Sequence, residues 1–156
     1  MYADPVTEPR WLSPEEIRLW QSFMRLSVST FQEVDADMKT DSSLTRDDYE
    51  VLVHLSGAPD HQLAMGELSD RVFNSRSRLT QRIDRMQAKG LVSREQRPDD
   101  KRSTLACITK LGMDTITAAA PHHVESVRRH LLDHVPSEQV VEMADLLDEI
   151  LASKGA

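Results

Sequence analysis

The sequence is poor in several residue types, and each shortage excludes a class of protein. Five glycines in 156 residues argue against a turn-rich, all-β fold. A single cysteine excludes an internal disulfide framework and a cysteine-based zinc cluster. There is no signal-peptide pattern, and no apolar run approaches the roughly 18 residues of a membrane-spanning helix, so we expect a cytoplasmic protein without a membrane partner.

Motifs of the common enzyme classes are missing as well. The chain has no glycine loop that would cradle a phosphate, no nucleophile elbow and no HExxH pair. Its scattered serines and histidines do not assemble into a triad in sequence. We therefore expect a protein that is not an enzyme and needs no cofactor. Its length and its 39% hydrophobic content suit one domain with a real core.

The charge is unevenly distributed along the chain. The formal net charge is −7, but residues 71–102 hold ten basic and four acidic side chains, a net charge of +6. The remainder therefore carries −13. A basic island on an acidic body is the pattern that a DNA-binding surface requires.

The basic island begins with a helix pattern. Leu79, Ile83 and Met86 recur at i, i+4 and i+7, so they share one face. The pair Lys89-Gly90 is a typical helix end, with a cation in the last turn and a glycine suited to left-handed backbone.

The arginines of this helix are placed unfavourably for folding alone. Arg76 and Arg78 lie in the first turn, where the helix dipole is already positive. Arg78 and Arg82 are like charges at i and i+4, and Asp84 and Glu95 offset little of this cost. A free-energy cost of these charges that no neighbouring residue compensates suggests a polyanion partner. The alternative is a solvated basic face.

A short helix precedes the arginine-rich helix, and a hairpin follows it. The expected elements are an edge strand at Gln62–Ala64, a helix at about Met65–Val72, and hairpin strands at Leu91–Arg94 and Thr104–Ile108. Two helices joined by the short turn at Phe73-Asn74 form a helix-turn-helix, and the hairpin is then its wing.

Longer helices are predicted before this unit. Ser13 and Glu16 form a capping box, and the helix that follows runs to about Lys39, a length of about 40 Å. Such a helix is long for a small domain, so we expect part of its face to pack on another subunit. The alternative is a helix that wraps wholly within its own domain. A second helix is predicted from an N-cap at Thr45 to Gly57.

Two more helices are predicted after the hairpin. One starts at Thr109 and continues towards Val135, with a kink or short break at Pro121 because proline removes a hydrogen bond and crowds the preceding turn. The last runs from about Glu138 to Leu151.

Several short pieces of the chain occur in a distinctive order. They are Leu44-Thr45 with Tyr49–Leu52, Glu67–Ser69, Arg82–Met86, Lys89–Val92, the wing's Asp100–Arg102 with its D-x-R pattern, and Leu105–Thr109 with Gly112. In this order and spacing, over nearly the whole length, the sequence resembles the MarR family of winged-helix transcription regulators.

The resemblance implies a mainly α-helical fold with a small β-hairpin, in which a winged helix-turn-helix DNA-binding domain joins a helical dimerisation region. Residues 1–40 would form an N-terminal arm and dimerisation helix, residues 41–109 the DNA-binding domain, and residues 110–156 the C-terminal dimerisation helices, in one continuous unit. The implied protein is a triangular homodimer that represses transcription from a pseudo-palindromic operator. The alternative is a winged-helix protein–protein adaptor that does not bind DNA.

In this arrangement the arginine-rich helix enters the major groove of double-stranded DNA, which is wide enough to admit one α-helix. The side chains expected towards base edges are Arg76, Ser77, Arg78, Thr80 and Gln81. Those expected on phosphates, which position without specifying, are Arg82 and Arg85.

The wing is expected to reach the neighbouring minor groove. Arg102 is the main candidate there, with Arg97 and Lys101 beside it. Asp100 is expected to hold Arg102 in place; the alternative is an ordinary hairpin ion pair.

The resemblance also implies a small ligand, often an aromatic acid or a phenol, between the dimer helices and the winged domain. Its binding would shift the two recognition helices and relieve repression. The candidate pocket residues are Trp20, Met24 and Arg25 on the first helix and His54 on the second, with plain packing as the alternative for each.

Two remaining features are weighed against simpler explanations. His122, His123, His130 and His134 gather on one helix, and the last two have i, i+4 spacing that can serve a metal. No cysteine accompanies them, and we expect no metal site. Cys107 alternates with apolar residues in the return strand, which favours a small buried hydrophobe over a redox sensor.

Overall fold

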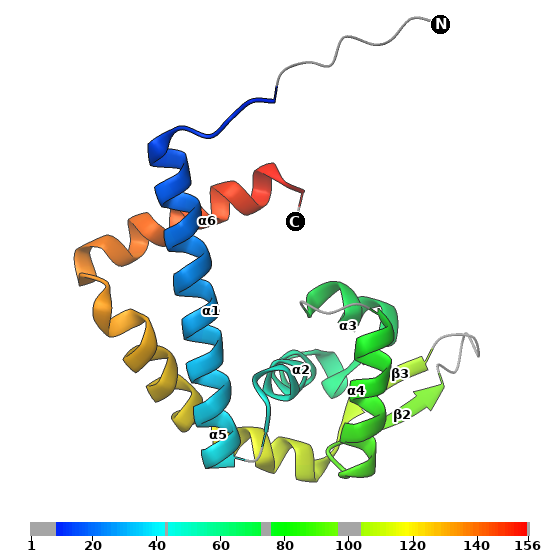
Figure 1. The fold of residues 1–156 in the computed structure, drawn as a ribbon. Coiled ribbons are helices and arrows are strands. Elements are labelled where there is room, and N and C mark those ends of the chain that lie inside the picture. The colour runs from blue at the N-terminus through cyan, green and yellow to red at the C-terminus, as the bar shows by residue number, and fades with distance from the viewer. Residues whose placement is uncertain (1–8, 43, 73–75, 97–103, 156) are drawn as a thin grey trace, which may run out of the picture.

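Helices make up most of the chain, as the sequence predicts. A computed structural model describes residues 9–42, 44–72, 76–96 and 104–155. Figure 1 shows α1 (Pro14–Ser42), α6 (Val140–Ser153) and the later part of α5 (Lys110–His130) on one side, while the first part of α5 extends to the other side. The shorter helices α2 (Arg46–Ser56), α3 (Met65–Arg71) and α4 (Arg76–Ala88) lie with a small sheet on the other. None of the helices in these ranges combines the length and apolar character needed to cross a bilayer.

Helix α1 is capped as expected but is only partly covered by its own chain. The Ser13 amide donates to Glu16 Oε2 at 2.7 Å, and the Glu16 amide donates to Ser13 Oγ at 3.2 Å, which completes the capping box. Towards the C-terminal end, Val34 and Met38 are buried. In the N-terminal part, Trp20 remains 56% exposed. An apolar face without a cover in the single chain is what subunit packing would require.

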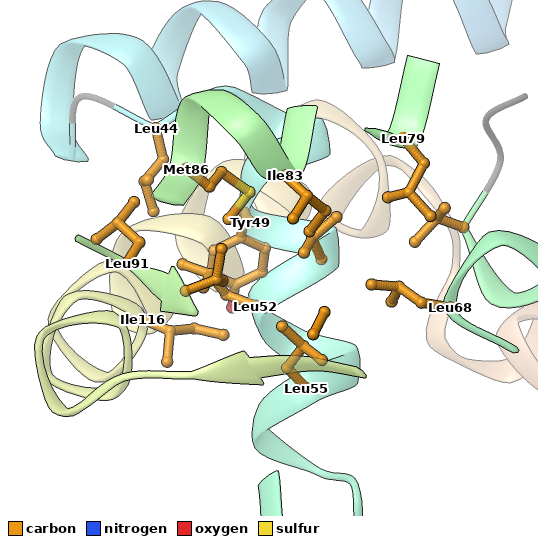
Figure 2. Close-up of a cluster of buried hydrophobic side chains, with 14 of the residues drawn as sticks. Leu44, Tyr49, Leu52, Leu55, Leu68, Leu79, Ile83, Met86, Leu91 and Ile116 are labelled. Atoms are coloured by element: carbon orange, nitrogen blue, oxygen red, sulfur yellow. The ribbon is translucent and has the colours of Figure 1, made fainter. Parts of the chain in front are cut away.

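The core is built around α2. A capping box joins Thr45 and Asp48 at its start, and Leu52 and Leu55 are fully buried farther along the helix. Figure 2 shows these two leucines surrounded by side chains of α3, α4 and α5, with Ile116 supplied by α5. The core therefore holds α2, α3, α4 and the start of α5 in one body.

Helix α4 follows the predicted periodicity. Leu79, Ile83 and Met86 are 1%, 0% and 1% exposed, so the predicted stripe is the buried face. Gly90, just after the helix, has φ +74°, the left-handed conformation expected of a glycine at this position.

The sheet contains β1 (Gln62–Ala64), β2 (Val92–Gln96) and β3 (Thr104–Ile108) in the order β1-β3-β2, all antiparallel. Leu63 and Arg94 both pair with Ala106, which places β3 in the middle. The predicted edge strand and hairpin are confirmed, with β2 beginning and ending one to two residues later than expected.

The C-terminal helices differ from the prediction at their ends. Helix α5 ends at His130 rather than near Val135, and 3-10 turns at 132–134 and 137–139 lead into α6. Pro136 accounts for the extended backbone of Val135, the residue before it, whereas the helix already ends where Leu131 adopts φ −141°. Pro121 lies inside α5 without breaking it, and the helix changes direction along its length in Figure 1.

Candidate nucleic-acid interface

The polar side of α4 faces away from the core. Ser77, Arg78, Thr80 and Gln81 are all exposed, opposite or beside the buried stripe. Arg76 is the first residue of the helix, and its side chain lies outside the described part of the structure. Helix α4 thus presents several of the side chains expected to contact bases together, on its solvent-exposed face.

Arg94 ties the hairpin to this helix. Its guanidinium pairs with the carboxylate of Asp84 and also donates to the Thr80 backbone oxygen at 3.2 Å. Strand β2 is therefore anchored to α4 by a charged contact between two residues of the basic island. The other expected wing residues lie outside the described residues; they are Arg97, Asp100, Lys101 and Arg102.

Arg82 is placed differently from the phosphate contact expected for it. Its side chain is 12% exposed and forms ion pairs with Asp47 at 2.6 Å and Asp48 at 2.7 Å, both in the first turn of α2. The cost of its charge on α4 is therefore compensated from another helix, about 35 residues away in sequence. The inference of a polyanion partner from uncompensated charge does not apply to this arginine.

Arg85 lies on the same flank of α4 and is exposed. Together with Arg82 it borders a surface groove whose other walls come from α1 and the start of α2. At about 100° per residue, Arg85 lies between the directions of Gln81 and Arg82 on the helix, so it adjoins both the groove and the exposed face.

The expected ligand residues do not gather in one cavity. Met24 and Arg25 line an open hollow formed by α1 residues alone. Trp20 is exposed on α1, and His54 is half-buried on α2.

A separate cavity of about 340 Å³ lies among α1, α2 and α5. Its walls are Thr30, Phe31, Val34, Arg46, Tyr49, Glu50, Val53, His123, Val127 and Leu131. Sequence reasoning missed these residues, although Tyr49 and Val53 have the i, i+4 spacing of one helix face.

Three polar atoms of this cavity have no hydrogen-bond partner among the described residues: Thr30 Oγ1, Glu50 Oε2 and His123 Nδ1. Thr30 is 8% exposed as a whole. The His123 ring lies 4.3 Å from the ring of Tyr49, and burial lowers the pKa of His123 below its usual value. Buried polar atoms normally have hydrogen-bond partners. A cavity lined by three polar atoms that lack such a partner is therefore suited to bind a polar ligand or water.

The remaining candidates have structural contacts. His130 Nε2 lies 2.9 Å from Asp37 Oδ2, and His134 Nε2 lies 2.9 Å from the Arg129 backbone oxygen. Across the described ranges, no group of three or more histidine, cysteine, aspartate or glutamate side chains could hold a metal ion. Cys107 is buried at 9% exposure, as expected of a small hydrophobe, and burial raises the pKa of its thiol.

An antiparallel hairpin beside two helices, the second with a polar outer face, defines a winged helix-turn-helix protein. Residues 42–103 match the family model described as MarR family. Three regulators of that family from Streptomyces coelicolor are similar in structure.

Sco3205, crystallised in complex with DNA, is 30% identical with a TM-score of 0.88, over 93% of this chain and 91% of that one. AbsC is 34% identical with a TM-score of 0.87, over 95% and 100%. Sco5413 is 26% identical with a TM-score of 0.79, over 92% and 97%. The comparison with curated proteins found no match. The chain belongs to the MarR family of transcriptional regulators.

Proposed function

We propose that this chain is a sequence-specific regulator that binds double-stranded DNA as a homodimer and represses transcription from a pseudo-palindromic operator. The observation that carries the proposal is the exposed face of α4, where Ser77, Arg78 and Gln81 stand opposite or beside the buried stripe. Arginine and glutamine are suited to bidentate contacts with guanine and adenine in the major groove. The similarity to Sco3205, which was crystallised with DNA, supports the same partner here.

The test is selection of bound fragments from a pool of genomic DNA, followed by gel shifts at 50 and 200 mM salt. We expect selective binding, with log affinity falling by about 0.9 per log salt for each phosphate contact. The selected fragments should contain half-sites about one helical turn apart, because a twofold dimer presents two recognition helices. Absence of a selective shift would favour a protein–protein adaptor and overturn the proposal.

The homodimer is supported by apolar side chains without cover in the single chain. No residue of α6 is buried, although Leu146, Leu147, Ile150 and Leu151 lie on it. Trp20 of α1 is similarly exposed. Apolar area of this extent on two helices is typical of an interface between subunits.

We also propose that a small ligand releases the protein from DNA. The cavity among α1, α2 and α5 is the best-supported site for this ligand. The cavity walls are mainly apolar, with Tyr49 and His123 as an aromatic pair. The unpartnered Glu50 Oε2 needs a hydrogen-bond donor, which a phenol supplies and an aromatic carboxylate does not. Arg46 also lines the cavity, but its guanidinium already pairs with Asp47. A hydroxylated aromatic compound is therefore the better-matched class.

Phenol and benzoate are a matched pair of probes for this site. We expect phenol to raise the melting temperature and weaken the gel shift, whereas benzoate changes neither. Thr30→Val removes one of the unpartnered oxygens at nearly constant volume and should reduce the response to phenol. An equal response to both probes would contradict the assignment to Glu50.

A further inference from the structure

Arg82 stands at the edge of the buried face of α4. At about 100° per residue, it lies about 60° from the Leu79–Ile83–Met86 stripe, whereas Ser77 and Gln81 lie on the opposite side of the helix. Its side chain is only 12% exposed. The arginine in the middle of the basic island therefore points along the protein surface towards α2 instead of outward.

The guanidinium of Arg82 holds the first turn of α2. Its two terminal nitrogens donate to Asp47 Oδ2 at 2.6 Å, to Asp48 Oδ1 at 2.7 Å and to Thr45 Oγ1 at 3.1 Å. Thr45 and Asp48 are the two members of the α2 capping box. Arg82 therefore contacts the residues that define where α2 begins, and α4 and α2 cannot shift independently without breaking these bonds.

The same network continues to α1. Asp47 accepts a second bond through Oδ1, from Arg46 at 2.6 Å. The Arg46 backbone amide donates to Asp35 Oδ1 on α1 at 3.0 Å, and its guanidinium lies 4.6 Å from the ring centre of Phe31. A continuous chain of polar contacts thus runs from the long helix α1 through the start of α2 to the middle of α4.

The charges of this network leave little for an external anion. Two arginines face two aspartates at its centre, so their formal charges cancel. Among the buried side-chain atoms of this network in the described residues, Arg82 Nε is the one without a hydrogen-bond partner. An arginine is suited to this position because its planar fork presents two separate nitrogens, one to Asp47 and one to Asp48 and Thr45, a spacing that the single ammonium of a lysine does not reproduce.

We infer that Arg82 is a positioning residue for DNA binding, one that locks α4 onto the capping box of α2 and contacts no phosphate. The inference rests on the proposed DNA binding. In this inference, the contacts with α2, and through α2 with α1, fix the orientation of α4. The two roles, lock and phosphate contact, make opposite predictions for two kinds of measurement.

The first measurement is the salt dependence of affinity for a duplex recovered with the wild-type chain. Arg82→Ala should weaken binding about tenfold or more, because it leaves the carboxylate of Asp48 without its cation and that of Asp47 with Arg46 alone. The slope of log affinity against log salt should match the wild type. A phosphate contact would instead reduce the slope by about 0.9 for each copy, about 1.8 in a dimer. Arg85→Ala removes an exposed arginine of the same helix that is expected on a phosphate, and it should show the slope change that a lost contact produces.

The second measurement keeps Arg82 and changes its partner. Asp47→Asn weakens the lock, so DNA binding should become weaker even though a negative charge has been removed. If Arg82 contacts a phosphate, the same variant frees its charge and DNA binding becomes tighter. Asp70→Asn, which removes an exposed carboxylate from α3, measures the effect of charge alone.

Arg82→Lys retains the charge and covers the case in which Arg82→Ala does not fold. If Arg82 holds α4 onto α2, this variant should bind DNA weakly, since the single ammonium of lysine does not reproduce the two-nitrogen fork that contacts Asp47 and Asp48. Near-wild-type affinity of Arg82→Lys, a reduced slope for Arg82→Ala, or tighter binding by Asp47→Asn than by Asp70→Asn would each overturn the inference. A wild-type chain that binds no DNA selectively would instead contradict the proposed function itself.

Discussion

Gly112 in the first turn of α5 stands directly against the backbone oxygen of Leu91. A Cβ atom placed on Gly112 would lie 2.1 Å from that oxygen, far inside any normal contact. The same oxygen accepts bonds from the amide and the hydroxyl of Thr109, both at 3.1 Å, and the Thr109 hydroxyl caps Gly112 at 3.0 Å. The glycine therefore permits the close junction between α5 and the strand region that begins the wing.

This contact predicts the effect of Gly112→Ala. We expect the free energy of unfolding to fall by about 3 kcal/mol or more, because the neighbour that must move is backbone. Urea denaturation followed by circular dichroism measures it. Gly66→Ala is the matched control: a Cβ there meets nothing within 4 Å, and a gain of about 0.5–1 kcal/mol is expected in α3. Equal stability of the two variants would contradict this account of the junction.

The lowered pKa of Asp37 leads us to expect that the stability of the fold depends on pH. Hydrogen bonds from Ser126 at 2.7 Å and from His130 hold the pKa of Asp37 below its usual 3.8. A lowered pKa stabilises the fold above the unfolded value, and this contribution disappears as the pH falls through the folded value. Asp37→Asn should therefore be less stable than the wild type above about pH 5, with the difference shrinking below about pH 4. A difference that does not change between pH 3 and pH 7 in urea denaturation would exclude this linkage.

The exposure of Leu147 on α6 leads to a prediction about the oligomeric state. Leu147 is 41% exposed, among other apolar side chains that the single chain leaves uncovered. Leu147→Glu should convert the dimer to a monomer in sedimentation experiments, because it places a charge in the proposed interface. Binding to two-half-site DNA should be lost with it. Leu111→Glu makes the same change on α5, outside the proposed α6 surface, and should remain dimeric; persistence of the Leu147→Glu dimer would move the interface away from α6.

The exposed position of Gln81 leads to a prediction about which bases the protein prefers. Gln81 lies on the side of α4 opposite the core, where a glutamine can bond the edge of an adenine. Gln81→Ala should change the sequence recovered by selection at one position of each half-site, at a cost of about 1–3 kcal/mol for the original base. The salt slope should stay the same, because a neutral side chain releases no counterion. An unchanged recovered sequence would remove Gln81 from the base-reading set.

Much of the fold could be predicted because local chemistry decides it. The Leu79–Ile83–Met86 spacing identified the buried face of α4, and Thr45 and Thr109 were predicted as the N-caps that they are. Gly90 was predicted in the left-handed conformation that it adopts. Each of these depends on residues within one or two turns of one another. The end of α5 was predicted too late, because the stop was placed at Pro136 whereas the backbone leaves the helix at Leu131.

The site was predicted less completely, because its details depend on contacts across the sequence. Nothing within α4 indicates that Arg82 pairs with Asp47 and Asp48, which lie on α2. The cavity likewise combines side chains of α1, α2 and α5, and those predicted for the ligand lie elsewhere.

By itself the sequence determined the class of fold, the helix proposed to face DNA and the basic island that suits a polyanion, since periodicity and charge are properties of neighbouring residues. Only the tertiary structure decided which arginine of α4 is paired with α2 and where a cavity lies. Both depend on which helices pack together, and an ion pair or a cavity wall exists only once distant segments have been brought within a few ångströms of each other.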